Sequence, residues 1–337
     1  MKKMHKNRWM ITGLIFLLLG AIFISFRLGR YPITTKDLIG ILGSKVVPIQ
    51  PFWKPQLETV LFNIRLPRIF LACLVGCCLS SAGAAYQGVF QNPMAAPDIL
   101  GASAGAAFGA ALAILLDGTS AMITGSAFFF SLVTVFMVYQ ISKHTRGASI
   151  LGLILSGIMV SSLFLAATSF VKLVADPTDQ LPAITYWLMG SLAGAKSGEV
   201  FFVLLPMLVG LIPLYLLRWR LNVLAMGDDE AQTMGVDPKK IRFIIIVAST
   251  LITAASVSVS GMIGWVGLVI PHLARKMVGN DYRYLMPATM LFGATFLLLV
   301  DNVSRNLLST EIPLGILTAV VGAPFFLYLI TREDDFS

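Results

Sequence analysis

The side chains that could carry out catalysis are few and widely spaced in this chain. Of its three histidines, His5 lies in a basic N-terminal tail, His144 in a polar stretch and His272 beside Pro271. Metalloproteases and P-loop ATPases use the spacings H-E-x-x-H and G-x-x-x-x-G-K, and neither occurs. We therefore expect no ATP binding or hydrolysis in the chain itself. A membrane enzyme acting on lipid-linked substrates is disfavoured for the same reason, because it would need a cluster of acidic residues or histidines.

One charged segment, Gly227–Arg242, interrupts a sequence that is otherwise strongly apolar. Asp228, Asp229 and Glu230 can stabilise the start of a short helix through the helix dipole. Gly235 and Pro238 should end that helix before the next apolar run. An ordered charged helix indicates a surface on which a partner docks. The alternative is a solvated amphipathic loop.

Two other groups of residues could bind a proton or a metal. Asp301 lies inside an apolar run, one helical turn before Arg305, so it can form an ion pair on one helix face or act in a proton relay. We favour the structural role. Cys73 and Cys77 share a helix face, with Cys78 beside them, and could hold a soft metal. No histidine or carboxylate joins them nearby, so we expect small-residue packing and no metal site.

The composition defines the class of protein. Of the 337 residues, 57% are hydrophobic and 12% are charged, and mean hydropathy is +0.83. Apolar runs of roughly 18–24 residues predict an all-α polytopic membrane protein with a single transmembrane domain over residues 1–337. The net charge of +8 fits loops that face a lipid bilayer. No basic patch with interleaved aromatic residues indicates nucleic-acid binding.

The apolar runs predict about ten transmembrane helices. The first follows a basic tail and is too long for a cleaved signal peptide, so we expect it to be retained. Gly261, Gly264 and Gly267, followed by Pro271, predict a broken or short eighth helix. The expected ranges are 9–28, 66–89, 98–116, 121–141, 149–173, 199–217, 241–260, 263–278, 284–306 and 313–331.

Basic residues in short loops predict cytoplasmic N- and C-termini. Lys143, Arg146, Arg218, Lys240 and Arg275 would then face the cytoplasm together with other basic residues, whereas the loops at 117–120 and 307–312 contain no Lys or Arg. The exception is the outer region 27–68, which holds seven basic residues. That region requires a further explanation.

Two stretches of small or rigid residues are candidates for helix contact or for closing a pathway. Gly101, Gly105 and Gly109 place small residues on one helix face, which suits packing within one bundle or between subunits. Asn92-Pro93-Met94 leads to Pro97 and Asp98, a rigid turn with a good helix cap. This turn is either a tight connection or a constriction across a translocation path.

Several of these motifs together resemble the FecCD-type permeases of ABC importers. The motifs occur in the expected order from about residue 60 to 331. They are Arg65-Leu-Pro-Arg68, Gly83-Ala-Ala-Tyr-Gln87-Gly, Asn92-Pro-Met-Ala-Ala-Pro97, Gly264-Trp-Val-Gly-Leu-Val-Ile-Pro271-His272, Ile312-Pro-Leu-Gly-Ile-Leu-Thr318 and Gly322-Ala-Pro324. The resemblance implies a type II ABC importer permease fold, which agrees with the predicted helix count.

The resemblance also assigns roles to residues. It implies that the segment of about 227–241 forms coupling helices that contact an ATPase subunit, through Gly227, Asp228, Asp229, Glu230, Ala231 and Gly235. Arg65, Arg68 and Arg305 would face outward and dock a substrate-binding protein, and arginine suits such carboxylate pairing. Lipid-headgroup anchoring is the alternative. The turn Asn92-Pro93-Met94 and the loop near Ser149 would close the cytoplasmic end of the pathway.

The function implied by the resemblance is uptake of a metal chelate by alternating access. The expected cargo is an iron(III)-siderophore, with haem, cobalamin and molybdate left open. The implied partners are a second permease copy in a homodimer, two ATPase subunits that bind ATP and Mg, a substrate-binding protein and the bilayer of the bacterial inner membrane. The chain itself would hold no cofactor. The rival is an ion-coupled carrier working alone, which would need carboxylates deep in its helices.

Overall fold

The computed structural model describes residues 2–29, 31–48, 50–144 and 150–331, without the side chains of residues 2–4, 329 and 330. These residues form α-helices, one π-helical segment and their connections, and no strand. Each of the ten predicted spans corresponds to one helix. They are α1 (Lys2–Arg27), α4 (Leu66–Val89), α5 (Ala102–Leu115), α6 (Ser120–His144), α7 (Ile150–Val174), α9 (Ser197–Leu216), α12 (Pro238–Ser260), α13 (Val266–Val278), α14 (Tyr282–Asn306) and α15 (Leu314–Thr331).

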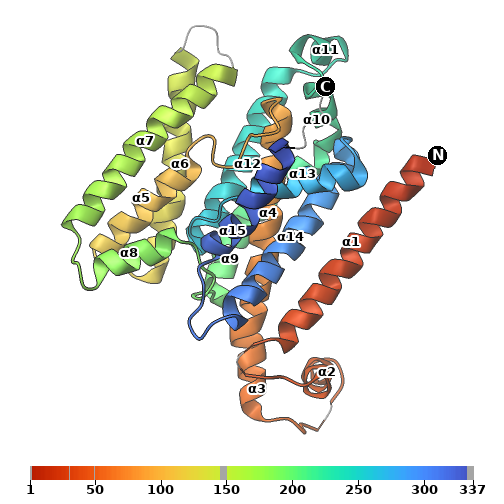
Figure 1. The fold of residues 1–337 in the computed structure, drawn as a ribbon, viewed down its shortest axis with the longest axis vertical. Coiled ribbons are helices and arrows are strands. Elements are labelled where there is room, and N and C mark those ends of the chain that lie inside the picture. Colours follow the sequence, from red (N-terminus) through yellow and green to blue (C-terminus); the bar gives the residue numbers. More distant parts are fainter. Residues whose placement is uncertain (1, 30, 49, 145–149, 332–337) are drawn as a thin grey trace.

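Among the described residues, seven helical stretches are long and apolar enough to cross a membrane, and α5 and α15 are shorter apolar helices. Shorter elements lie at the two ends of the bundle (Figure 1). We call these ends the α11 end and the α8 end. The α11 end carries α10 (Arg218–Leu224) and α11 (Asp228–Thr233). The α8 end carries α2 (Thr35–Ser44), α3 (Pro55–Thr59), the π-helical segment η1 (Val60–Arg65) and α8 (Gln180–Leu188).

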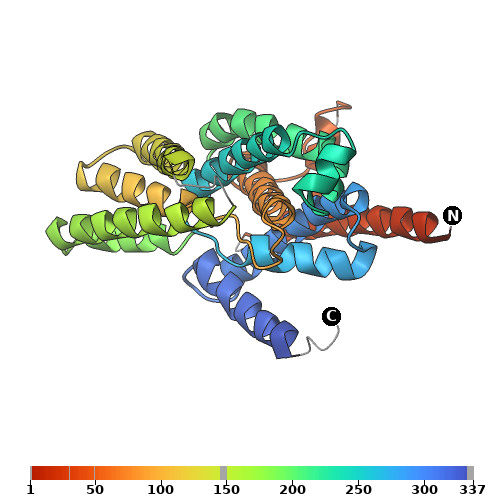
Figure 2. The same cartoon turned by 90° about the horizontal axis from the view of Figure 1, so that it is seen from above.

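The helices form two groups that are joined through α12. Helices α5, α6, α7 and α8 pack together on one side, and α1, α4, α9, α13 and α14 pack on the other (Figures 1 and 2). Helix α12 contacts α4 and α9 in the larger group and α5 and α6 in the smaller one. Helix α15 contacts α13 and α14, and in the view from above it projects from one side of the bundle (Figure 2).

Glycines set the closest helix contacts. A Cβ at Gly83 of α4 would lie 1.8 Å from the carbonyl oxygen of Gly267 in α13. A Cβ at Gly105 or Gly109 would lie 2.4 Å from a backbone oxygen of α6. The Gly101–Gly109 stripe therefore packs within the bundle, and only glycine allows the backbones to come this close.

Two connections that enter the bundle are not helical. Helix α5 has 14 residues, about 21 Å of rise, which is less than the roughly 30 Å of a hydrocarbon core. The non-helical residues 91–101 precede it and are packed against α7 and α13 through Gly157 and Gly267. The break predicted after residue 260 is also present. Helix α13 begins at Val266, after Gly261 (φ 65°) and Trp265 (φ 70°), and has 13 residues.

A π-helical segment ends at Arg65, directly before α4. Segment η1 continues directly into α4, where Pro67 occupies the first turn. A π turn contains one residue more than an α-helical turn, so it rotates the following side chains about the helix axis.

Candidate functional site

Helix α11 is a short charged helix at the surface of the α11 end. It begins after Gly227, whose φ of 133° suits only glycine, and its first turn holds Asp228, Asp229 and Glu230. It ends at Thr233. Gly235, with a φ of 75°, then turns the chain, and the N–H of Val236 donates to the carbonyl of Ala231 (2.9 Å). These boundaries agree with the sequence prediction, although the helix spans only six residues of the predicted segment.

An ion pair fixes α11 to the long helix α12. The two carboxylate oxygens of Asp228 accept from the guanidinium of Arg242, at 2.6 and 3.2 Å. Within α11 the side chain of Ala231 is completely buried, whereas Asp229 and Glu230 are exposed. Asp228 therefore holds the helix in place, and the two other carboxylates are presented to the exterior. The Arg242 contact was missed because the sequence gives no reason to choose among the basic residues that follow Asp228.

The turn predicted as a gate lies at the same end, beside α10. The Asn92 side-chain oxygen accepts from the Met94 N–H (2.8 Å), and Gln91 donates from Nε2 to the Leu224 carbonyl (3.0 Å). Pro97 packs against Gly267 of α13. Asp98 accepts from the Ser103 N–H in the first turn of α5 (2.8 Å), but the residue at the N-cap position is Gly101, because the chain makes a further turn after Asp98 before the helix begins. The predicted gate residue Ser149 lies outside the described residues.

The same segment contains a serine in the G-x-S-x-G spacing of serine hydrolases, which the sequence analysis overlooked. Ser103 lies between Gly101 and Gly105. In those enzymes the serine occupies a strained turn between a strand and a helix. Here it lies in the first turn of α5, its N–H is bound to Asp98, and the described residues include no strand. The local structure does not suit a nucleophile.

The three predicted docking arginines lie towards the α8 end and are buried. Arg65, Arg68 and Arg305 are 4%, 6% and 8% exposed. Arg65 donates to the carbonyl oxygens of Phe26 and Tyr31, so it joins η1 to the residues at the end of α1. Docking by these three residues stays a prediction. Their guanidinium groups would have to leave present partners in order to reach a second protein.

Arg68 and Arg305 meet at one buried carboxylate. Asp301 has no exposed surface; it accepts from Nη2 of Arg68 (2.9 Å) and lies 3.1 Å from Nε of Arg305. Arg68 also forms two hydrogen bonds with the half-buried Glu311, at 2.8 and 2.9 Å. Neighbouring Asn302 donates to Ser25 of α1 (2.6 Å). The ion pair predicted from the Asp301–Arg305 spacing is present, and it belongs to a larger network.

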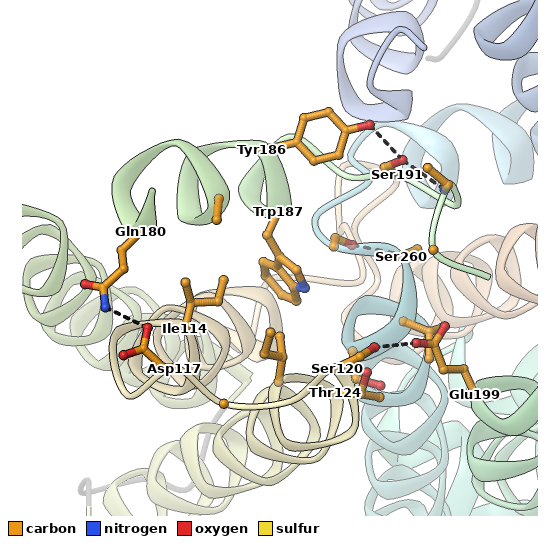
Figure 3. Close-up of a pocket in the computed structure, with 18 of the residues that line it drawn as sticks. Ile114, Asp117, Ser120, Thr124, Gln180, Tyr186, Trp187, Ser191, Glu199 and Ser260 are labelled. Atoms are coloured by element: carbon orange, nitrogen blue, oxygen red, sulfur yellow. Dashed lines mark hydrogen bonds between the residues drawn. The ribbon is translucent and has the colours of Figure 1, made fainter. Parts of the chain in front are cut away.

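A cavity of about 620 Å³, lined by both apolar and polar side chains, lies at the α8 end between the two groups of helices. Figure 3 shows the side chains that surround it, which come from α5, α6, α8, α9, the end of α12 and the connections that follow α5 and α8. Ser120 donates to Glu199 (2.7 Å), and Gln180 donates to Asp117 (3.0 Å). The first of these hydrogen bonds connects the two groups. Helix α8, which the sequence analysis did not predict, forms one wall.

A further group of polar residues lies in the connection between α13 and α14. Asp281 caps α14 and accepts from Asn222 of α10 (2.8 Å) and from Arg283 (2.7 Å). Burial alone would raise the pKa of Asp281, but the hydrogen bonds from Arg283 and Asn222 outweigh it and hold the pKa below its usual range. This carboxylate therefore joins α10 to α14 as an anion at neutral pH.

Comparison with known proteins decides the family. The model of the FecCD transport family matches residues 17–332. The chain belongs to the FecCD transport family. Its members are transport permeases rather than catalytic subunits, and they work as membrane subunits of ABC transporters. The fold expected from the resemblance is also confirmed. A metal-chelate type ABC transporter in an inward-facing conformation aligns with a TM-score of 0.85 and 39% identity, covering 96% of this chain and 98% of the other.

FecCD relatives with similar sequences differ in their cargo. The molybdate import system permease protein MolB of Haemophilus influenzae is 40% identical over 96% of this chain and 95% of its own length. The cobalamin import system permease protein BtuC of Halobacterium salinarum is 41% identical over 85% of this chain and 77% of its own. The hemin transport system permease protein HmuU of Yersinia pestis is 35% identical over 87% and 91%. Identity alone does not select a substrate.

Metal binding was not expected in this FecCD chain. The described residues contain no group of three or more His, Cys, Asp or Glu side chains that could hold a metal ion. Cys78 is buried in α4, and Cys73 and Cys77 are partly buried there. The three thiols lie in a helix that packs closely on α13 and α14.

Proposed function

We propose that this protein is the permease subunit of an ABC importer for a small metal-containing solute, either a metal chelate or a metal oxyanion. An ATPase subunit would bind at the α11 end, which we place in the cytoplasm, and a substrate-binding protein would deliver the solute at the α8 end. The observation that carries the proposal is the clamped helix α11. Its exposed carboxylates, Asp229 and Glu230, stand on a helix that is joined to α12 by Arg242.

The mechanism follows from that clamp. Helix α11 is held to α12 by an ion pair, and its Ala231 side chain is buried. A displacement of α11 by the ATPase subunit would therefore also displace α12, whereas a flexible loop would not transmit the movement. Helix α12 contacts both groups of helices, so its displacement would change how they meet. Such a rigid-body change, driven by ATP binding in the partner, is a form of alternating access. The turn at Asn92–Met94 would then open or close the cytoplasmic end.

The orientation rests on two observations. The start of α1 and the end of α15 both lie towards the α11 end (Figure 1). That end also carries Arg218, the first residue of α10, and Lys239 and Lys240 in the first turn of α12. This distribution follows the positive-inside rule for short loops. With this orientation the basic residues of the region 27–68 lie outside. Their exposed members, Arg27, Lys36, Lys45 and Lys54, are available to carboxylates of a binding protein, whereas Arg65 and Arg68 support the surface from beneath.

A second copy of the chain would complete the pathway. Helix α15 projects from the bundle and exposes Ile316, Val320 and Leu327. Its first turn is fixed at the α8 end, because the N–H of Leu314 donates to the Gly190 carbonyl (2.8 Å). An anchored helix with a free apolar face suits the contact between two permeases. Cysteines at position 320 in an otherwise cysteine-free variant should cross-link two copies in vesicles, and a wholly monomeric product would contradict this part of the proposal.

The rival function, an ion-coupled carrier, is not favoured by the described residues. Their fully buried carboxylate within a span, Asp301, is bound by two arginines. A proton relay needs a carboxylate that is free to meet a proton donor, whereas this one is enclosed between two guanidinium groups. The carrier hypothesis would require transport without an ATPase.

The test is uptake by proteoliposomes that contain the permease, its co-encoded ATPase and its binding protein. We expect uptake that requires ATP inside, tested first with iron(III)-siderophores and then with molybdate, haem and cobalamin. Asp229→Ala together with Glu230→Ala should abolish uptake and weaken ATPase binding, whereas Lys143→Ala, an exposed basic residue at the end of α6 and outside the segment 227–241, is the control. Uptake driven by an ion gradient without the ATPase would overturn the proposal in favour of the carrier.

A further inference from the structure

A second groove, of about 800 Å³, opens at the α11 end. It lies between the end of α4, the Asn92–Pro93 turn, α10 and the connection from α13 to α14. Gln87 and Tyr282 lie at its base, and Arg275, Lys276 and Arg283 contribute positive charge. The function proposed above assigns no role to this groove.

The positive charge of the groove is only partly neutralised. Asp281 is the one carboxylate among the lining residues, and it is bound to Arg283 and Asn222. Arg275 donates to Gln87 (2.5 Å) and to the Tyr282 hydroxyl (3.3 Å), both neutral groups. Within the described part of the chain it has no ion-pair partner. A partly buried guanidinium normally has an anionic partner, because burial of an unpaired charge is costly.

The neutral groups beside Arg275 are arranged as donors. Gln87 is 3% exposed, and its side-chain oxygen is occupied by Arg275. Its amide nitrogen has no hydrogen-bond partner among the described residues. The Asn92 side-chain oxygen is likewise occupied, by the Met94 N–H, which leaves its amide group as a donor. Positive side chains together with unused N–H donors are the groups that bind phosphate and similar oxyanions.

We propose that this groove is a binding site for a tetrahedral oxyanion, held by Arg275 and Lys276 with the Asn92 amide as a further donor. Basic residues near a membrane surface are common. This groove differs from an ordinary basic surface because Arg275 is half-buried with neutral partners and lies beside an unused buried donor. The ligand can be the phosphate of a lipid headgroup or a free oxyanion from the aqueous phase.

An anion in the groove would contact two moving parts of the transporter. Asn92 and Pro93 belong to the proposed gate, Asn222 belongs to α10, and Met226 lies between α10 and α11. The anion would therefore hold the gate turn and α10 together, adding to the Gln91–Leu224 hydrogen bond. The proposal concerns binding to the permease itself and does not depend on the ATPase, on the cargo or on which side of the membrane the groove faces.

The first experiment measures binding of inorganic phosphate to the whole permease, delipidated in a maltoside detergent that contains no phosphate. We expect phosphate to raise the melting temperature with saturation, whereas chloride at equal ionic strength does not, because a ligand that binds only the folded state stabilises it. Lys276→Gln should weaken the apparent affinity about tenfold through loss of one charge. Lys239→Gln, a basic residue at the same end outside the groove, should leave it unchanged.

A second variant protects the test against misfolding. Arg275→Gln breaks two contacts and can disturb the fold, but Gln87→Glu keeps the shape and supplies Arg275 with an internal carboxylate. It should abolish phosphate binding and raise the melting temperature without ligand. Equal responses to phosphate and chloride, or an unchanged phosphate response in both Lys276→Gln and Gln87→Glu, would count against a free oxyanion as the ligand.

The second experiment distinguishes the lipid source. Native mass spectrometry of permease extracted from membranes should show a bound anionic phospholipid if the headgroup is the ligand, and Gln87→Glu should lose it while Lys239→Gln retains it. Phosphate binding without retained lipid assigns the site to a free oxyanion. If neither phosphate nor phospholipid binding responds to Gln87→Glu and Lys276→Gln, the proposal is wrong.

Discussion

Among single residues, Asp301 is subject to the strongest constraint. Its carboxylate has no access to solvent and lies between the guanidinium groups of Arg68 and Arg305. The contact with Arg305 could be predicted from the sequence, because residues four apart share a helix face. The contacts of Arg68 could not, since Asp301 and Glu311 are more than two hundred residues away in the chain.

We predict that Asp301→Asn destabilises the protein by about 3–5 kcal/mol, because it leaves two buried guanidinium groups without their shared anion. Glu311→Gln also removes a carboxylate from Arg68, but Glu311 is partly exposed, so water can replace it and the loss should be much smaller. Thermal unfolding in detergent measures both. Equal losses would show that the depth of Asp301 does not matter.

Asp281 gives a prediction about pH. Its pKa in the folded protein is held below the usual value, so it contributes stability that is present above the unfolded pKa, about 3.9. That contribution is lost as pH falls through the folded pKa. The melting temperature of wild type should therefore exceed that of Asp281→Asn at pH 6, and the difference should shrink below pH 4. A constant difference from pH 3 to 7 would contradict this assignment.

The helices themselves were largely predictable, because apolar length and Gly/Pro interruptions are local features. All ten spans were found, including the short α13 after the glycine-rich break. Helices α2, α3, α8 and α10 were not. They are short and amphipathic, and long-range contacts such as that of the Ser191 N–H with the Ser260 carbonyl position the chain around α8. Short helices of this kind carry too little periodic signal to be recognised.

The glycine contact between α4 and α13 leads to a matched comparison. Gly83→Ala places a methyl group against the Gly267 carbonyl, whereas Gly125→Ala on α6 meets nothing within 4 Å. We expect Gly83→Ala to destabilise by about 1–3 kcal/mol through overpacking. Gly125→Ala should be neutral or stabilising by up to about 1 kcal/mol from helix propensity. Melting temperatures of the two variants provide the test, and similar values would refute the close contact.

The clamp between α11 and α12 is tested by exchange of charges. Arg242→Asp should repel Asp228, loosen α11 and reduce ATP-driven uptake severalfold while the fold is retained. The double variant Arg242→Asp with Asp228→Arg restores an ion pair, although its geometry differs, and should recover part of the uptake. Basal ATPase activity of the partner is measured in parallel. Failure of the double variant to recover any uptake would show that Asp228 acts by touching the partner rather than by holding α11.

In the whole molecule, two groups of helices meet through α12 and enclose a cavity at the α8 end. If transport moves these groups relative to one another, a link across the cavity should stop it. We expect that cysteines introduced at Ser120 and Glu199, in a variant without Cys73, Cys77 and Cys78, can be joined by a short bifunctional reagent that blocks uptake. The same reagent on either single variant is the control. Full uptake after cross-linking would show that the groups move as one body.

The functional surfaces could be predicted from the sequence only where they depend on one continuous segment. Helix α11 and the Asn92–Pro93 turn belong to that class. The groove around Arg275 does not, because Gln87, Asn222 and Tyr282 come together only after α4, α10 and α14 have packed. The burial of Arg65, Arg68 and Arg305 was equally hidden, since an arginine near the end of a span has the same sequence signature whether it faces water or a carboxylate.

The π-helical segment η1, which ends at Arg65, contains one residue more than a regular α-helical turn would. One residue of an α-helix corresponds to a rotation of about 100°, so the extra residue in η1 is equivalent to a single insertion that the helix absorbed without a loop. Deletion of one residue between Val60 and Ile64 should convert η1 into regular α-helix. The helix before Arg65, together with α3, would then turn by about that angle, while α4 stayed seated on α13 and α14. Relatives that differ by one residue at this point should therefore keep the buried arginine network but present a differently rotated α2–α3 surface to whatever protein meets this end.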